Sequence, residues 1–472
     1  MLVKLFVFIF LITYNYSMII FPFKTALNTI DSDDIEYNTT DYANDYYSQP
    51  AYTKIKIGNP SQEIKVLLSY NDCGFKIGKS FNCIYDEEYL SHYNRNSSSD
   101  FKYTNLYNKT NEFKNGRSAE DSIYAYTDLE LKNLKKFENI GFYLGTDTND
   151  ALCGIIGFRT NNYRYYCEYM NNVFSSFKTG NIVNNNDWFI KYTSKDEGLL
   201  IFNPEMDKLY QNYDFNKLLL TSSEKDSNPN SWAIVIDKVF SKNVNGSVIK
   251  KPQKAEINND FGLLEGSGDY YYNITKTYFK DYIKNRTCNL NDLKVGVYSY
   301  FGIECDKTKF GIEDLKKFPT LSLRVVSFQT DFTFDYKDLF TETKHKYFFN
   351  IIFNIYITER WVLGKPFLRK YPLLINFDSQ TIGYYNEQLE TESKDVIDPG
   401  TNYIFSEKFL IILIIIIFIL IILAGVSCYF IGKRLNKAKK RKANELEDDF
   451  DYTSSNDNGK NLFDDEAAVN KN

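Results

Sequence analysis

The feature that most constrains this chain is an almost wholly apolar stretch near its C-terminus. Residues Phe409 to Ile431 contain no charged side chain and are numerous enough to cross about 30 Å of hydrocarbon as an α-helix. Basic residues follow at once, and such residues collect on the cytoplasmic side of a membrane span. They are Lys433, Arg434, Lys437, Lys439, Lys440, Arg441 and Lys442. We therefore expect a transmembrane helix at 409–431 and a charged cytoplasmic tail at 432–472.

The N-terminus is typical of a secretory signal peptide. Lys4 precedes a short apolar run from Leu5 to Ile12, which is too short to span a bilayer. We expect a signal peptide at 1–17, with an uncleaved anchor as the alternative. Together with the C-terminal span, this predicts a single-pass membrane protein whose N-terminal part is lumenal or extracellular.

Cysteine and asparagine patterns agree with an exported N-terminal part. An even set of cysteines suits disulfide formation in an oxidising compartment. These are Cys73, Cys83, Cys153, Cys167, Cys288 and Cys305, and sequence neighbours are the natural pairs, although other connectivities are possible. Acceptor triplets for N-glycosylation begin at Asn38, Asn96, Asn108, Asn245, Asn273 and Asn285.

Composition narrows the class of function. The 472 residues carry a formal net charge of -5, so a nucleic-acid role has no electrostatic support. The only histidines, His92 and His345, stand in polar surroundings that predict a surface location. Neither a metal-ligand spacing nor a phosphate-binding glycine loop occurs, so we expect no metal and no cofactor.

Between the two membrane signals the chain is expected to be mostly β. Ile55 and Ile57 alternate with lysines, and Phe332, Phe334 and Tyr336 alternate with polar residues, the period of half-buried strands. We expect an acidic lead at 18–47, a β body of two lobes at 48–390, and a polar stalk at 391–408.

Five segments, in order along the chain, carry a resemblance to a known family. They are Tyr52–Ser69, Gly154–Phe158, Gly198–Phe202, Trp232–Asp237 and Trp361–Tyr371. The last is similar to a Trp-Ile-Leu-Gly-x-x-Phe-Leu-Arg pattern, and together they resemble the pepsin-like aspartic proteases. The resemblance implies an all-β, bilobal fold with an N-terminal lobe at 48–205, a C-terminal lobe at 206–390 and a peptide-binding cleft between them.

That family's chemistry needs two aspartates that share one proton across the lobe interface. In the first lobe the resemblance places the family position at Ser69, whose hydroxyl is no base near neutral pH. The alternative register uses Asp72. In the second lobe it places the family position at Gly266, between Glu265 and a Ser-Gly pair, and the alternative is Asp260.

The altered loops predict a function without peptide hydrolysis. The flap turn of the family also has only a distant equivalent, at Phe113–Gly116. We expect a membrane-anchored, inactive homologue of the pepsin-like aspartic peptidases that binds a peptide or protein ligand, or acts as a scaffold, through its ectodomain. The alternative is an active membrane-anchored endopeptidase that uses Asp72 and Asp260. A third possibility is a structural surface glycoprotein with a collapsed cleft.

Overall fold

The computed structural model describes part of the chain. The described residues are 18–25, 50–70, 73–77, 93–104, 116–145, 154–159, 176–178, 182–183, 185–224, 232–241, 246–295, 298–354, 356, 359–389 and 433. Two compact units are present, Met1–Thr391 and Glu392–Asn472, and the account below concerns the first. The expected signal peptide, stalk and transmembrane segment at 409–431 lie outside the described residues. Among the residues that are described, no helix is both long and apolar enough to cross a membrane.

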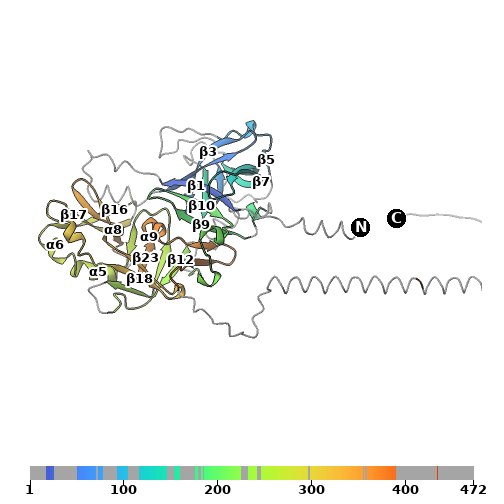
Figure 1. Cartoon of the computed structure of the whole chain (residues 1–472). Helices are drawn as coiled ribbons and strands as arrows, with labels where there is room; N and C mark the ends of the chain where they lie inside the picture. The colour runs from blue at the N-terminus through green and yellow to red at the C-terminus, as the bar shows by residue number, and fades with distance from the viewer. Residues whose placement is uncertain are drawn as a thin grey trace, which may run out of the picture. The chain divides into compact units, whose positions relative to one another are not determined.

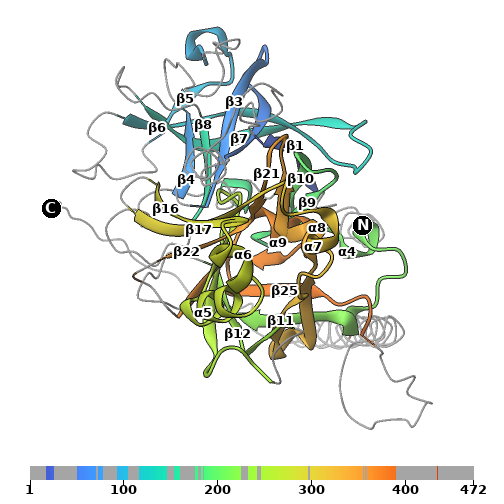
Figure 2. The ribbon, with the colours of Figure 1, turned by 90° about the vertical axis from the view of Figure 1, so that its left-hand side faces the viewer.

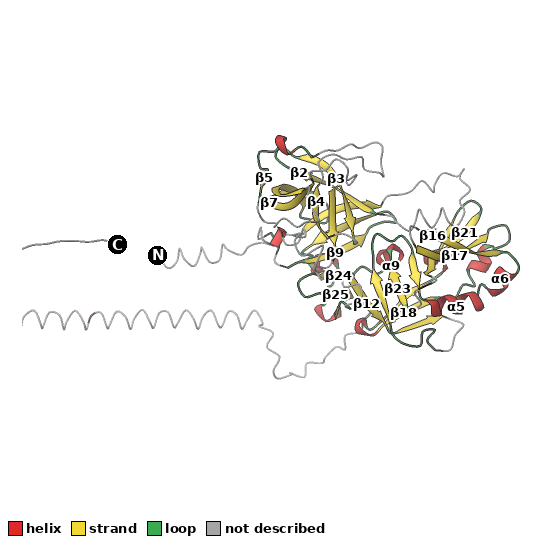
Figure 3. Cartoon of the chain, turned by 180° about the vertical axis from the view of Figure 1, so that it is seen from behind, coloured by secondary structure: helices red, strands yellow, loops and turns green. Residues whose placement is uncertain are grey.

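The first unit is built mainly of β-strands with a few short helices, of which α5 and α6 lie at its margin and α9 lies among the strands (Figures 1 and 3). The largest sheet has thirteen strands in the order β11-β25-β24-β9-β10-β1-β2-β3-β8-β4-β7-β6-β5. Their bounds are β1 (Ile19–Thr25), β2 (Ala51–Ile57), β3 (Gln62–Ser69), β4 (Cys73–Ile77), β5 (Lys102–Tyr103), β6 (Gly116–Tyr126), β7 (Leu134–Gly145), β8 (Gly154–Phe158), β9 (Asp187–Tyr192), β10 (Glu197–Phe202), β11 (Leu218–Ser222), β24 (Leu374–Asn376) and β25 (Thr381–Tyr385).

A second sheet of nine strands forms the centre of the second lobe, and a three-stranded sheet, β13-β18-β19, accompanies it. In the view of Figure 2 the blue and cyan strands of the first lobe lie above the yellow and orange strands of the second. The bounds are β12 (Trp232–Ile236), β13 (Lys238–Ser241), β14 (Gln253–Ile257), β15 (Leu264–Gly266), β16 (Cys288–Val295), β17 (Tyr298–Asp306), β18 (Leu321–Val325), β19 (Thr330–Phe334), β20 (Phe340–Glu342), β21 (Lys346–Phe349), β22 (Ile351–Asn354) and β23 (Arg360–Leu363).

The described helices are short. The α-helices are α4 (Met206–Leu209), α5 (Gly268–Lys276), α6 (Lys280–Lys284), α7 (Ile312–Leu315), α8 (Tyr336–Leu339) and α9 (Lys365–Lys370), and the 3-10 turns are η1 (Arg95–Ser97), η2 (Phe215–Lys217) and η3 (Val326–Phe328). Ser267 caps α5, because its side-chain oxygen accepts a hydrogen bond from the backbone N–H of Tyr270.

Alternating apolar and polar residues form the strands that the sequence predicts. In β2, Ile55 and Ile57 are buried while the intervening lysines are exposed, because successive side chains of a strand point to opposite faces. Phe332 and Phe334 are likewise buried in β19. Tyr336, which continues their alternation in the sequence, instead begins α8 after the cap at Asp335.

The N-terminal boundary of the body differs from expectation. Residues Ile19–Thr25, which we expected in the acidic lead, form β1 between β10 and β2. Ile19, Ile20, Phe21 and Phe23 are almost fully buried there. This apolar content is what a central strand needs, so the β body begins at Ile19 and not at residue 48.

The C-terminal strands also cross the expected boundary between the lobes. Leu374–Asn376 pairs with β9, and Thr381–Tyr385 pairs with β11, so both extend the sheet that contains the first-lobe strands. Both segments lie in the range expected for the second lobe. Strands from both lobes therefore pair in one sheet, and their backbone hydrogen bonds hold the lobes together.

One expected disulfide is confirmed. Cys288 and Cys305 are bonded at an S–S distance of 2.00 Å and link β16 to β17. Cys83, Cys153 and Cys167 lie outside the described residues, and only the backbone of Cys73 is described. The pairs expected among these four cysteines stay predictions.

The same strand arrangement occurs once in each lobe. In the first lobe, β3 runs parallel to β8, β4 runs antiparallel to β8, and β4 runs parallel to β7. In the second lobe, β14, β23, β15 and β22 repeat these three relations in the same sense. The loop between β3 and β4 in the first lobe is called the first loop, and the loop between β14 and β15 in the second lobe is called the second loop. These two loops meet at the candidate site.

Candidate functional site at the meeting of the two loops

The repeated arrangement gives the equivalent positions of the two loops. Ser69 ends β3 opposite Gly157, and Phe75 lies opposite Ile156. In the second lobe, Leu264 lies opposite Leu363, the residue that precedes Gly364. The backbone N–H of Asn258, directly after β14, donates to the carbonyl of Leu363 at 3.1 Å. The number of residues from Ser69 to Phe75 is the same as that from Asn258 to Leu264. Ser69 and Asn258 therefore occupy equivalent positions at the start of the two loops.

This equivalence corrects the expected second-lobe position. Gly266 lies inside β15, and a Cβ atom added there would stand 2.6 Å from the ring of Phe353. Packing of β15 against β22 therefore explains this glycine. The residue at the start of the second loop is Asn258, which bears a carboxamide. A signal for it was available in the sequence, since Asn258 directly follows the apolar alternation of Ala255 and Ile257.

Asp260 joins the two loops across the lobe boundary. Its carboxylate Oδ2 accepts a hydrogen bond from the Ser69 hydroxyl at 3.1 Å and another from the backbone N–H of Tyr70 at 2.9 Å. The backbone N–H of Asp260 in turn donates to the Asn258 side chain at 3.0 Å. The structure thus brings together two of the residues singled out from the sequence, Ser69 and Asp260, while Asp72 lies outside the described residues.

Aromatic side chains enclose this crosslink. Tyr70 is buried against Phe158 and Trp188, with ring centroids 5.5 and 5.4 Å away. The Tyr192 hydroxyl donates to the Asn259 side chain at 2.6 Å. Burial raises the pKa of Tyr70 and the pKa of Tyr192 well above the ordinary range of tyrosine, so both phenols stay protonated at physiological pH.

A buried lysine completes the site. Lys365 begins α9 and has no exposed surface, and its ammonium nitrogen lacks a hydrogen-bond partner within the described part of the chain. Burial lowers the pKa of Lys365 from 10.5 to about 7, and the charges of Asp260 and Asp196 offset part of this effect. The pattern around Trp361 gave no hint of this lysine, because its burial depends on how α9 packs.

Gly364 lets α9 approach the second loop. A Cβ atom at this position would stand 2.1 Å from the carbonyl oxygen of Leu263 and 2.3 Å from that of Phe261. With glycine there, the N–H of Lys365 reaches the Phe261 carbonyl at 2.8 Å. The loop and the helix therefore form one packed unit.

The geometry limits what chemistry these groups perform. A shared-proton pair needs two carboxyl groups in contact. Among the described residues, the Asp260 carboxylate accepts hydrogen bonds from the Ser69 hydroxyl and the Tyr70 backbone amide. A serine hydroxyl beside a carboxylate also needs a stronger base to become a nucleophile. His345 is exposed in the turn before β21, as the sequence predicts, and His92 lies outside the described residues. Among the described residues no cluster of potential metal ligands occurs.

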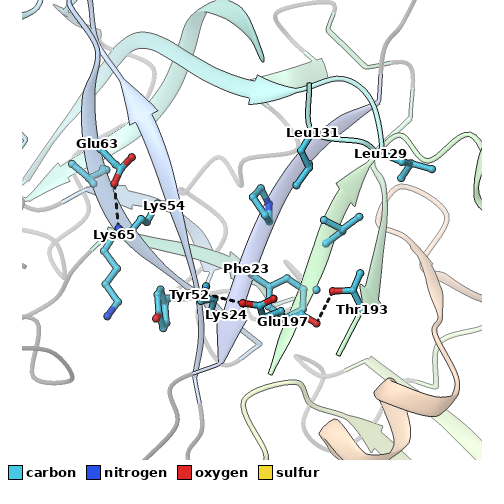
Figure 4. A pocket seen from close by; sticks show the side chains of 14 residues that line it. Phe23, Lys24, Tyr52, Lys54, Glu63, Lys65, Leu129, Leu131, Thr193 and Glu197 are labelled. Atoms are coloured by element: carbon cyan, nitrogen blue, oxygen red, sulfur yellow. Dashed lines mark hydrogen bonds and ion pairs between the residues drawn. The ribbon is translucent and has the colours of Figure 1, made fainter. Parts of the chain in front are cut away.

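A pocket lies on the first lobe, between β1, β10 and the β2–β3 hairpin (Figure 4). Its volume is 560 Å³, within the usual range of small-molecule pockets. Two ion pairs belong to its lining, one of 2.7 Å between Lys24 and Glu197 and another of 3.4 Å between Lys54 and Glu63. Apolar side chains supply much of the wall, namely Pro22, Phe23, Ile64, Leu129, Leu131 and Leu199.

The expected glycosylation sites differ in accessibility. Asn96 and Asn285 are exposed, whereas Asn273 is half-buried within α5. The remaining acceptors, Asn38, Asn108 and Asn245, lie outside the described residues, as do residues 113–115 of the expected flap turn.

Comparison with known proteins finds similar structures but no similar sequence. No protein-family model matches the chain, and no curated protein matches it either. The crystal structure of basic 7S globulin from soybean matches with a TM-score of 0.50 at 10% identity, over 78% of this chain and 95% of that one. This chain has a pepsin-like aspartic proteinase fold. The aspartic proteinase from Irpex lacteus matches with a TM-score of 0.48 at 9% identity, over 73% of this chain and 96% of the other.

Proposed function

We propose that this protein is a pepsin-like ectodomain without peptidase activity that binds a peptide or protein ligand, or serves as a scaffold, at a membrane. The observation that carries the proposal is the bond between Asp260 and the first loop, at Ser69 and Tyr70. In the proposed state the carboxylate serves to hold the lobes together.

The argument against catalysis rests on both loop positions. Ser69 and Asn258 occupy the equivalent loop starts, and neither side chain ionises near neutral pH. Asp260 stands two residues later and is engaged by donors of the other lobe. An aspartic peptidase needs one carboxyl group as base and a second as acid, so this arrangement supports a binding role.

The argument for binding rests on the preserved framework. The strands that carry both loops are intact, and a pepsin-like fold implies a cleft for an extended peptide above them. Strand-like recognition uses backbone hydrogen bonds and side-chain pockets, and needs no catalytic group. The ligand we propose is therefore a peptide or an extended segment of a protein.

The membrane part of the proposal rests on the sequence. We propose that residues 409–431 span the bilayer once, with the ectodomain lumenal or extracellular and residues 432–472 cytoplasmic. Glycosidase sensitivity of the exposed Asn96 and Asn285 in membranes isolated from expressing cells tests this orientation. Protection of a C-terminal tag by sealed vesicles with the cytoplasmic face inward is the expected companion result.

Peptidase activity is tested with the purified ectodomain and an unbiased peptide library between about pH 3 and 7, where paired aspartates work. We expect no cleavage. Cleavage that Asp72→Asn and Asp260→Asn each abolish, while the exposed control Asp281→Asn retains it, would contradict the proposal. That outcome would establish the active endopeptidase instead.

Ligand binding is tested on the same library by fluorescence anisotropy. We expect that some peptides bind saturably and that unlabelled copies compete. A folded, disulfide-intact ectodomain that binds no peptide would favour a purely structural glycoprotein.

A further inference from the structure

A cavity of 580 Å³, which shares no lining residue with the first-lobe pocket, is lined by residues of α8, α9 and the turn between β9 and β10. Residues from five separate regions line it: the β9–β10 turn, the second loop, the α8–β20 segment, Asn350 between β21 and β22, and α9. The lining residues with formal charge are Lys195, Lys337, Asp338, Glu342, Arg369 and Lys370. The cavity therefore gathers four cations and two carboxylates.

The two carboxylates are already paired. Asp338 forms an ion pair with Lys370 at a distance of 2.7 Å. Glu342 is bound at 2.6 Å by Lys307, a residue outside the lining. After these pairings, the cavity keeps an excess of positive charge from Lys195 and Lys337, together with Arg369, whose ion pair with Asp196 is long at 3.8 Å.

Among these cations, Arg369 is the residue best suited to bind an anion directly. Its guanidinium forms a long ion pair of 3.8 Å with Asp196 and lies over the Tyr192 ring, 5.5 Å from the ring centroid. Its Nε is buried without a hydrogen-bond partner in the described part of the structure. A planar guanidinium favours a planar oxyanion, which it binds through parallel hydrogen bonds.

We infer that this cavity binds an acidic peptide segment, with a carboxylate seated on Arg369 and neighbouring carboxylates near Lys195 and Lys337. The three cations come from three different elements, which suits charges spaced along a chain. Pro366 and Phe340 add apolar wall against which the stems of glutamate side chains pack. A hollow with one sign of charge also concentrates ligands of the opposite sign. Its lining contains none of the residues that form the crosslink between the loops, although Gly262 belongs to the second loop.

The test measures binding of a fluorescent hexaglutamate peptide to the intact ectodomain. We expect saturable binding that Lys195→Gln/Lys337→Gln weakens about three- to tenfold, because both lysines are exposed and each exposed charge pair contributes modestly. The matched control is Lys280→Gln/Lys284→Gln, which removes the same charge from the exposed side of α6 and is expected to leave affinity unchanged. Arg369→Lys, which keeps the charge but loses the planar donor set, is expected to weaken binding further.

Three outcomes would overturn the inference. The first is no binding of hexaglutamate by the folded protein. The second is equal weakening in the α6 control, which would indicate attraction by net charge alone. The third is tight binding of inorganic phosphate that hexaglutamate does not displace, which would assign the cavity to a compact anion. None depends on whether the interlobe loops cleave or bind peptides, so this test and that of the proposed function fail independently.

Discussion

Replacing Lys365 with methionine is expected to change how the stability of this protein depends on pH. The lysine is fully buried, and burial lowers its pKa from 10.5 to about 7. Asp260 and Asp196 favour the charged form, whereas Arg369 disfavours it. Methionine has a similar length and lacks the charge.

The magnitude follows from the two pKa values. Because one pH unit corresponds to about 1.4 kcal/mol, the difference between 10.5 and about 7 corresponds to about 5 kcal/mol of destabilisation when the lysine is protonated in both states. Below pH 7 this cost is fully present. Between pH 7 and 10.5 the unfolded chain holds the proton that the folded protein has released, so the free energy of unfolding rises with pH by up to about 1.4 kcal/mol per unit.

The assay is urea denaturation of the ectodomain at several pH values from about 6.5 to 9. Lys365→Met is expected to be more stable than the wild type at the acidic end, by less than 5 kcal/mol, because Asp260 loses a compensating charge. The advantage should shrink as pH rises. Lys280→Met, on the surface of α6, controls for loss of a lysine. Parallel pH profiles of wild type and Lys365→Met would refute the reasoning.

Three further changes probe the fold around the site. Asp260→Asn weakens the hydrogen bonds between the loops and should lower the free energy of unfolding by about 1.5–3 kcal/mol in thermal denaturation; an unchanged melting temperature would contradict its role as a crosslink. Gly364→Ala should prevent folding or cost more than about 3 kcal/mol, whereas Gly311→Ala, with open space around it, should cost a few tenths. Cys288→Ala should lower stability by about 2–4 kcal/mol under oxidising conditions, and no difference from wild type would argue that the bond to Cys305 is unimportant.

Much of the architecture was predictable from local patterns. The alternation at Ile55 and Ile57 predicted β2, and the short separation of Cys288 and Cys305 predicted their disulfide. The segment from Trp361 to Tyr371 indicated a pepsin-like fold, and the structure shows that it contains most of β23 and all of α9. These features depend on neighbouring residues, or on a set of short motifs whose order alone is informative.

The loop positions were harder to predict. The sequence offered Gly266 and Asp260 as alternatives for the second lobe, and the structure showed a third residue, Asn258, at the equivalent position. Register decided this, because Asn258 is placed by pairing of β14 with β23, a strand about a hundred residues further along the chain. The alternation of apolar and polar residues within the loop does not show which residue occupies the equivalent position.

The sequence by itself determined the β character of the body and the chemical identity of the residues available to a site, and it favoured Cys288–Cys305 among several possible disulfide pairings. Only the tertiary structure decided that Ile19–Thr25 joins the central sheet, that Asp260 bonds to the opposite loop, and that Lys365 is buried. The reason is physical. Strand formation follows from side-chain alternation along a few residues, whereas burial and pairing depend on segments far apart in the chain that meet only after folding.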